Sequence, residues 1–161
     1  MKANAPFCVL VLVLLVLAAC QDAPPASRDT PPASQETPAE MPRTASPEGA
    51  QVYIISPRDA ASLTAGEIIV QFGLKGMGVA PAGIEFLDTG HHHLLVNVET
   101  LPPSNLPILA DDQHLHFGKG QTETTLRLEP GTYTLQLLLG DKNHVPHDPP
   151  VVSEKITITV E

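Results

Sequence analysis

The stretch Gly90-His91-His92-His93-Leu94-Leu95 carries three consecutive histidines directly into an apolar, strand-like segment. Two further histidine groups follow it, His114-Leu115-His116-Phe117 and His144-Val145-Pro146-His147. All seven histidines of the chain lie between the first residue of this series, His91, and the last, His147. Neutral imidazole is the most common metal ligand in proteins, so this concentration indicates a metal-binding module.

The spacing of the first two groups suits a site on paired strands. Residues two apart on a strand point to the same face, so His91 and His93 share one face and His92 lies on the other. The two rings that share a face start ~6.6 Å apart along the strand, and His114 and His116 repeat that spacing. If the two segments are adjacent strands, their four imidazoles can meet at one point, because cross-strand Cβ atoms lie ~4.5–5.5 Å apart.

The remaining candidate ligands, His144 and His147, would reach this point from the loop before the last strand. Three carboxylates are candidates for orienting the rings by accepting a hydrogen bond from the ring nitrogen that does not bind the metal: Asp111, Asp112 and Asp141. An imidazole set without thiolates suits copper or zinc, and the sequence does not choose between them. The competing interpretation is that the histidines form a structural polar network, with His92 the clearest candidate for a structural role.

Short segments of alternating apolar residues surround this stretch, and no segment shows a helical period. The pattern predicts strands at residues 51–57, 67–74, 91–98, 114–117, 122–128, 132–139 and 155–160. It therefore predicts an all-β fold, a small antiparallel immunoglobulin-like sandwich of about six to seven strands. Residues 58–66 are predicted to form a turn. Residues 75–89 are predicted to form a long loop with Ile84 and Phe86 as apolar anchors.

The amino terminus reads as a lipoprotein signal. One lysine, Lys2, precedes an apolar run from Val9 to Leu17 that is too short to span a bilayer as a helix. The run ends in Leu17-Ala18-Ala19-Cys20, which resembles a bacterial lipobox; an ordinary Ala-x-Ala cleavage site is the alternative. The resemblance implies a signal peptide at 1–19 and lipidation of Cys20. The residue after the cysteine is Gln21 and not aspartate, and for a protein that resembles bacterial lipoproteins this implies the outer membrane facing the periplasm.

Residues 20–50 are rich in Pro, Ser, Thr, Ala and Glu and are predicted to form a disordered tether, whereas residues 51–161 form the β-domain. Loss of the signal removes Cys8, and lipidation occupies Cys20, which excludes thiolate metal sites and cysteine nucleophiles. It also removes Lys2, so 18 acids and 8 bases leave a net charge of −10. This charge argues against a nucleic-acid partner and leaves membrane attachment to the lipid anchor.

Several stretches together resemble domain-of-unknown-function family 4399, a bacterial envelope family. The stretches are residues 76–83, 89–95, 114–118, 121–124 and 137–150. The resemblance extends over about residues 51 to 160 and implies a small secreted β-domain. It implies no catalytic or binding residue, so the site assignment rests on the spacing of the histidines.

Three functions are compatible with the sequence. The first is an envelope lipoprotein that binds copper or zinc and buffers or delivers the ion. The second is a non-catalytic module that recognises an envelope protein or the cell wall, with the histidines as a polar network. The third is an enzyme, since a histidine-rich copper site on a β-sandwich also fits a superoxide dismutase or a copper oxygenase in outline. The sequence lacks the fuller motifs of those enzymes, which favours a protein without catalytic activity.

Overall fold

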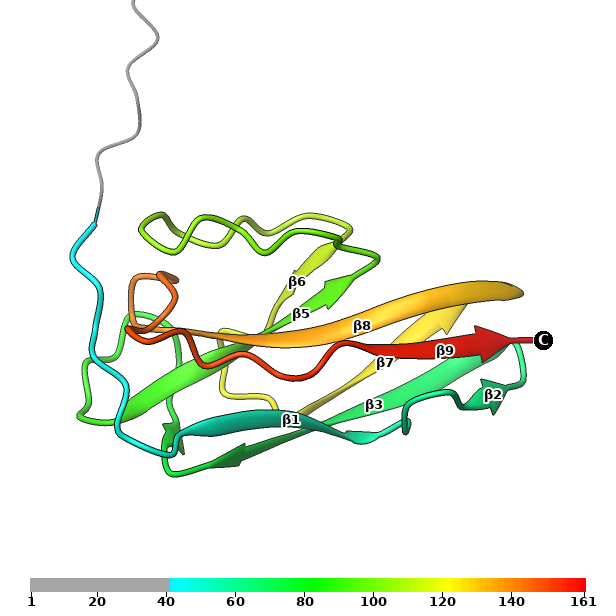
Figure 1. Ribbon diagram of the computed structural model, residues 1–161, viewed down its shortest axis with the longest axis horizontal. Coiled ribbons are helices and arrows are strands. Elements are labelled where there is room, and N and C mark those ends of the chain that lie inside the picture. The colour runs from blue at the N-terminus through cyan, green and yellow to red at the C-terminus, as the bar shows by residue number, and fades with distance from the viewer. Residues whose placement is uncertain (1–40) are drawn as a thin grey trace, which may run out of the picture. The chain divides into compact units, whose positions relative to one another are not determined.

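The computed structural model describes residues 41–161 of the chain. The predicted signal peptide, the lipidation site Cys20 and the predicted tether up to residue 40 lie outside the described residues. Within residues 41–161 the secondary structure is entirely β, and this part of the chain contains no helix apolar and long enough to cross a membrane. The strands are β1 (Gln51–Ser56), β2 (Ser62–Leu63), β3 (Gly66–Lys75), β4 (Gly78–Val79), β5 (Thr89–Val96), β6 (His114–His116), β7 (Glu123–Leu128), β8 (Gly131–Gly140) and β9 (Ile156–Val160) (Figure 1).

The strands form two sheets. The first is antiparallel and has the order β1-β3-β7, and the second has the order β2-β9-β8-β5-β4 with β6 also paired to β5 (Figure 1). The all-β prediction is confirmed, but the purely antiparallel arrangement is wrong, because β2 pairs with β9 and β4 pairs with β5 in parallel. Both added strands are two residues long and lie in segments predicted to be a turn and a loop. They are too short to show an alternating pattern.

The main apolar core lies between the two sheets. It draws alternate residues from strands of both sheets, as period-2 alternation requires. Its buried members are Val52, Ile68, Val70, Phe72, Leu94, Phe117, Leu126, Leu135, Leu137, Leu139, Val151, Ile158 and Val160. Aliphatic side chains therefore supply most of the burial that stabilises the fold.

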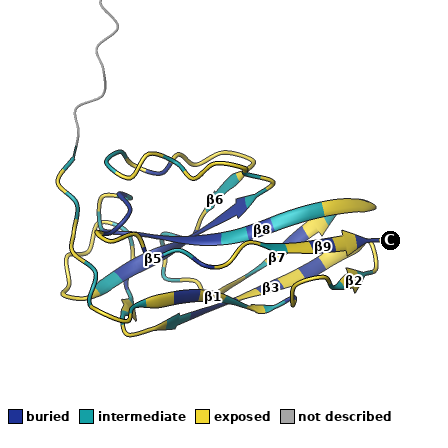
Figure 2. Ribbon diagram, in the orientation of Figure 1, coloured by how far each residue is buried: buried dark blue, intermediate teal, exposed yellow. Residues whose placement is uncertain are grey.

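Strand β5 is buried on both faces, and this property positions the histidines. Every residue from Gly90 to Leu95 is buried, and the strand is dark along most of its length in Figure 2. Leu94 faces the main core, whereas Leu95 packs with Ile108 and Leu138 in a second apolar cluster. The loop that carries Ile108 thus covers the outer face of the larger sheet. His91 and His93 point into this covered outer face together with Leu95.

The segment before β1 also makes ordered contacts with the domain. Residues 41–50 belong to the predicted tether, yet Ala45 forms a parallel β-bridge with Asp148. The backbone N–H of Ser46 donates to the carbonyl oxygen of Asp148 at 2.9 Å, and the N–H of Asp148 donates to that of Thr44 at 2.9 Å. Ordered structure therefore begins before Gln51, on the loop that follows β8.

The loop between β4 and β5 differs from the prediction. Ile84 and Phe86 were expected to anchor it in the core, but they are 53% and 72% exposed, and Leu87 is 82% exposed. The loop is held instead by polar contacts: the N–H of Gly83 donates to the carbonyl oxygen of Lys142 at 2.9 Å. The side chains of Ile84, Phe86 and Leu87 are therefore exposed at the surface.

Candidate metal centre

Strands β5 and β6 bring two histidine groups together, as the spacing predicted. The antiparallel register sets His93 opposite His116 and Leu95 opposite His114. His91 lies two residues before His93 on the same face of the sheet. The hypothesis that these two segments are adjacent strands is confirmed.

Three of the histidines form a compact group: His91, His93 and His116 each offer a ring nitrogen, and these nitrogens lie within 4.8 Å of one another. The ring centroids of His91 and His93 are 4.8 Å apart. The ring of His116 is 5.0 Å from that of His91 and 5.1 Å from that of His93. Two nitrogens bound to one ion at ~2.0–2.1 Å are at most about 4.2 Å apart, so small shifts of these side chains would let all three nitrogens bind one metal ion.

The two inner rings of this group are fully buried and lack hydrogen bonds. His91 is 1% exposed and His93 0% exposed. Neither Nδ1 nor Nε2 of either ring has a hydrogen-bond partner among the described residues. Leaving a buried polar group unpaired costs about 1–3 kcal/mol, so these rings destabilise the metal-free fold. A metal ion would satisfy one nitrogen of each ring.

Burial holds these rings in the neutral form that binds metals. Desolvation, reinforced by the neighbouring imidazoles of His144 and His116, lowers the pKa of His91 to about 4. The negative charge of Asp141 opposes that shift. Desolvation and the neighbouring imidazoles lower the pKa of His93 to about 2. The pKa of His116 is also lowered, by burial and by His144. A proton therefore competes poorly with a metal ion at neutral pH.

Two glycines make room for the rings. A Cβ atom at Gly140 would lie 2.8 Å from Cε1 of His93, and one at Gly118 would lie 2.3 Å from Cε1 of His116. Neither glycine has the positive φ that would itself require glycine. The close approach of an imidazole ring thus explains glycine at both positions. Neither glycine was predicted to contribute to the site, although Gly118 lies two residues after His116 and Gly140 is the last residue of β8.

A fourth ring approaches from the loop after β8. The centroid of His144 is 4.7 Å from that of His116, 5.0 Å from that of His91 and 6.1 Å from that of His93. His144 is half-buried and has a positive φ of 67°. The structure therefore places four of the six predicted ligands around one point, three of them in the compact group.

The other two predicted ligands lie outside this group. Nδ1 of His114 is 2.8 Å from Oδ1 of Asp111, and that hydrogen bond is the main reason why the pKa of Asp111 is lowered. Asp111 thus supports His114 and not the compact group, and its neighbour Asp112 is exposed. The ring of His147 is buried against backbone: Nε2 lies 3.2 Å from the carbonyl oxygen of Thr89.

The middle histidine of the series occupies the opposite face of β5, as expected. His92 packs against Phe72 of the main core with ring centroids 5.2 Å apart. Its Nδ1 lies 3.3 Å from the carbonyl oxygen of Gln121. Burial lowers its pKa. These contacts give His92 a structural position, turned away from His91 and His93.

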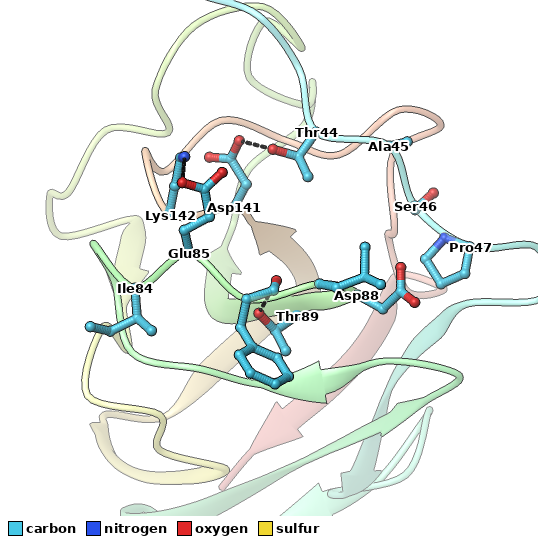
Figure 3. A pocket seen from close by; sticks show the side chains of 12 residues that line it. Thr44, Ala45, Ser46, Pro47, Ile84, Glu85, Asp88, Thr89, Asp141 and Lys142 are labelled. Carbon is cyan, nitrogen blue, oxygen red and sulfur yellow. Dashed lines mark hydrogen bonds and ion pairs between the residues drawn. The ribbon is translucent and has the colours of Figure 1, made fainter.

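The loop that carries His144 is organised by a buried carboxylate, that of Asp141. Its Oδ1 accepts the N–H groups of Asn143 at 2.8 Å and Val145 at 3.0 Å. Its Oδ2 accepts the hydroxyl of Thr44 at 2.7 Å, a bond drawn in Figure 3. Asp141 was predicted to orient a histidine ring through a direct hydrogen bond. In the structure its carboxylate accepts backbone N–H groups and so holds the turn that carries His144. The sequence offers no local signal for the contact with Thr44.

A surface pocket of ≈ 480 Å³ adjoins this turn. Its walls are the segment before β1 and the exposed loop before β5, joined at Asp141 and Lys142 (Figure 3). Nζ of Lys142 forms an ion pair with Glu85 at 2.6 Å across one end. The histidine rings do not line this pocket, so the pocket and the compact histidine group are separate features that share one turn.

The fold and the site define a β-domain of two sheets with a buried histidine group on the outer face of the larger sheet. Residues 70–161 match the family model described as domain of unknown function, DUF4399. This match spans more than half of the chain, and the chain belongs to that family. It includes all seven histidines and begins within β3, so β1 and β2 lie outside it. The chain matches no curated protein sequence.

Proposed function

We propose that this chain is an envelope lipoprotein that binds a transition-metal ion, copper or zinc, and buffers or delivers it. The ligands would be His91, His93 and His116. The observation that carries the proposal is the pair of fully buried rings whose four nitrogens have no hydrogen-bond partner among the described residues, beside a third imidazole. Lipidation at Cys20 and a position in the outer membrane facing the periplasm complete the proposal and rest on the lipobox.

The alternative, a structural polar network, predicts different contacts. A network stabilises a fold through hydrogen bonds that satisfy each buried donor and acceptor. His147 and His114 make such contacts, with Thr89 and Asp111 respectively. The absence of hydrogen bonds at His91 and His93 among the described residues favours a bound ion over a network.

Titration of metal-free, full-length protein with Zn²⁺ and Cu²⁺ by calorimetry tests this proposal. We expect one ion per chain at micromolar concentration, with binding that is retained between pH 7 and pH 5, because the lowered pKa values of His91 and His93 keep both imidazoles neutral over that range. A His91→Ala, His93→Ala double variant should lose this binding. Absence of uptake of both ions by the native sequence would remove the proposal.

A second function, recognition of another envelope component, is favoured by one observation. Phe86 and Leu87 are strongly exposed beside the surface pocket. Exposed apolar side chains grouped in this way commonly mark an interaction surface. Replacing both with serine should abolish capture of an envelope protein or of cell-wall fragments while leaving zinc binding unchanged. Unaltered capture by this variant would rule the surface out.

The finer fold assignment also stays a proposal. We infer an immunoglobulin-like sandwich from two facing sheets around one core and from the Pro130–Leu135 segment that enters β8. An experimental structure in which these sheets did not pack face to face would contradict this assignment.

A further inference from the structure

The fourth imidazole gives the candidate metal centre a defined geometry. His91, His93 and His116 lie on two paired strands, whereas His144 lies on the loop that follows β8. The six distances between the four ring centroids run from 4.7 to 6.1 Å. Five of the six do not exceed 5.1 Å.

These distances can be compared with those that a metal ion would impose. With metal–nitrogen bonds of ~2.0–2.1 Å, each ring centroid would lie about 3.2 Å from the ion. In a tetrahedral site all six distances between ring centroids are then about 5.2 Å. In a square-planar site the four distances between neighbouring rings are about 4.5 Å and the two distances between opposite rings are about 6.4 Å.

Five of the observed distances lie within about 0.5 Å of the tetrahedral value, and the sixth, between His93 and His144, is about 0.9 Å longer. A square-planar site requires two long distances between opposite rings. Only His93 and His144, at 6.1 Å, approach such a distance. The remaining pair, His91 and His116, would then also be opposite, but their centroids are 5.0 Å apart. The four rings therefore surround a point and do not lie around a plane.

We propose that His144 is the fourth ligand of a closed tetrahedral site, and that this site takes a d¹⁰ ion, Zn²⁺ foremost, in preference to Cu²⁺. The inference rests on the proposed metal binding and deepens it. Zn²⁺ has no preferred geometry of its own and accepts four imidazoles in a tetrahedron, whereas Cu²⁺ favours tetragonal arrangements. A closed site without an open position suits holding and transferring an ion rather than activating a bound water.

The four ligands differ in how firmly they are held. His91 and His93 are buried in the sheet, whereas His144 is half-buried on a turn. The N–H of His144 donates to the carbonyl oxygen of Asp141, and its own carbonyl accepts the N–H of Ile108, both at 2.9 Å. These bonds fix the backbone but leave the ring at the edge of the site. His116 on β6 is exposed, so an ion enters and leaves on the side of the site formed by His116 and His144.

The test uses Co²⁺ as a spectroscopic substitute for Zn²⁺ in the full-length chain, because tetrahedral Co²⁺ absorbs visible light far more strongly than five- or six-coordinate Co²⁺. His144→Asn is the informative variant, since asparagine tolerates positive φ and preserves the turn. Asn143→Ala is the matched control: the exposed neighbour contributes only its backbone N–H to Asp141. Unfolding midpoints of the metal-free proteins establish that both variants fold.

We expect intense Co²⁺ absorption from the native sequence and from Asn143→Ala. His144→Asn should lose most of that intensity, bind Zn²⁺ at least tenfold more weakly, and recover intensity when free imidazole is added. The ratio of Cu²⁺ affinity to Zn²⁺ affinity should rise in His144→Asn, because the tetrahedral constraint is then relaxed.

The outcomes separate this inference from the proposed function. If the native sequence binds no metal, both fail. If it binds metal and His144→Asn has the same spectrum and affinity, binding by three histidines stands and the role of His144 is overturned. Weak Co²⁺ absorption by a fully loaded native protein would likewise overturn the tetrahedral geometry while leaving metal binding intact.

Discussion

Replacing His93 with leucine should raise the stability of the metal-free protein and abolish metal binding. His93 is 0% exposed, and neither of its ring nitrogens has a hydrogen-bond partner among the described residues. Leaving a buried polar group unpaired costs about 1–3 kcal/mol, and leucine removes that penalty in nearly the same volume. The side chain opposite on β8 is Leu138, and Leu95 follows on the same face, so the new side chain meets apolar neighbours.

The expected gain is about 1–3 kcal/mol in the free energy of unfolding. For a domain of this size each 1 kcal/mol raises the melting temperature by about 3–6 °C. Thermal unfolding in the presence of a chelator, followed by circular dichroism, measures this shift. Zinc at a hundred times its Kd should stabilise the native sequence by about 2.7 kcal/mol and should leave His93→Leu unchanged.

His114→Leu is the matched control, because its ring lies on the same face but has a hydrogen-bond partner in Asp111. That variant should show no gain in stability, and zinc should still raise its melting temperature. The reasoning would be refuted if His93→Leu melted at a lower temperature than the native sequence in chelator and still responded to zinc. Such a result would mean that His93 stabilises the fold through polar contacts.

Three further predictions test the surroundings of the site. The lowered pKa values of His91 and His93, about 4 and about 2, mean that the unfolded chain binds more protons below pH 6.5. The free energy of unfolding of the metal-free protein is therefore retained above pH 6.5 and falls below that pH, by about 2 kcal/mol per histidine at pH 5. Urea unfolding at pH 7.5 and pH 5 should show this loss. An equal free energy of unfolding at the two pH values would contradict the burial of neutral rings. Gly140→Ala should displace the His93 ring, since the new Cβ would lie 2.8 Å from Cε1 of that ring. A calorimetric titration should then show zinc binding that is at least tenfold weaker. Unchanged zinc affinity would show that displacement of this ring does not affect the site. Thr44→Val removes the hydrogen bond from the Thr44 hydroxyl to Asp141 and should reduce zinc affinity severalfold, whereas Thr44→Ser keeps the hydroxyl and should keep the affinity. Equal affinities in all three proteins would show that the segment before β1 does not influence the turn that carries His144.

Much of the site followed from local periodicity. Alternation along a strand placed His91 and His93 on one face and His92 on the other, and the repeated spacing in His114 and His116 indicated the pairing of β5 with β6. These features are visible in sequence because a strand repeats every two residues. The predicted strand positions are reproduced for the same reason, apart from β2 and β4.

The choice among candidate ligands depended on contacts that periodicity does not encode. His114 pairs with Asp111 through a local bend, and His147 is buried against the carbonyl oxygen of Thr89 on a distant strand. His144 reaches the site because of a positive φ on a turn organised by Asp141. A sequence pattern gives no measure of such tertiary contacts, so it ranked His114 above His144 and did not separate His144 from His147.

The same limit explains why two apolar residues of the loop before β5 were wrongly predicted to anchor it. Ile84 and Phe86 were expected inside because apolar residues are usually buried in a compact domain. In the structure a backbone hydrogen bond from Gly83 to Lys142 holds the loop, and both side chains stay exposed. Composition predicts the average burial of such residues but not their position on a particular loop.

The most direct test is to locate the ion itself. Crystals of the protein grown with zinc, with diffraction data collected on both sides of the zinc absorption edge, would reveal the metal by its anomalous signal. We predict one strong peak at ~2.0–2.1 Å from a ring nitrogen of each of His91, His93 and His116. A map without a peak among these three rings, or with peaks only at exposed carboxylates, would contradict the account.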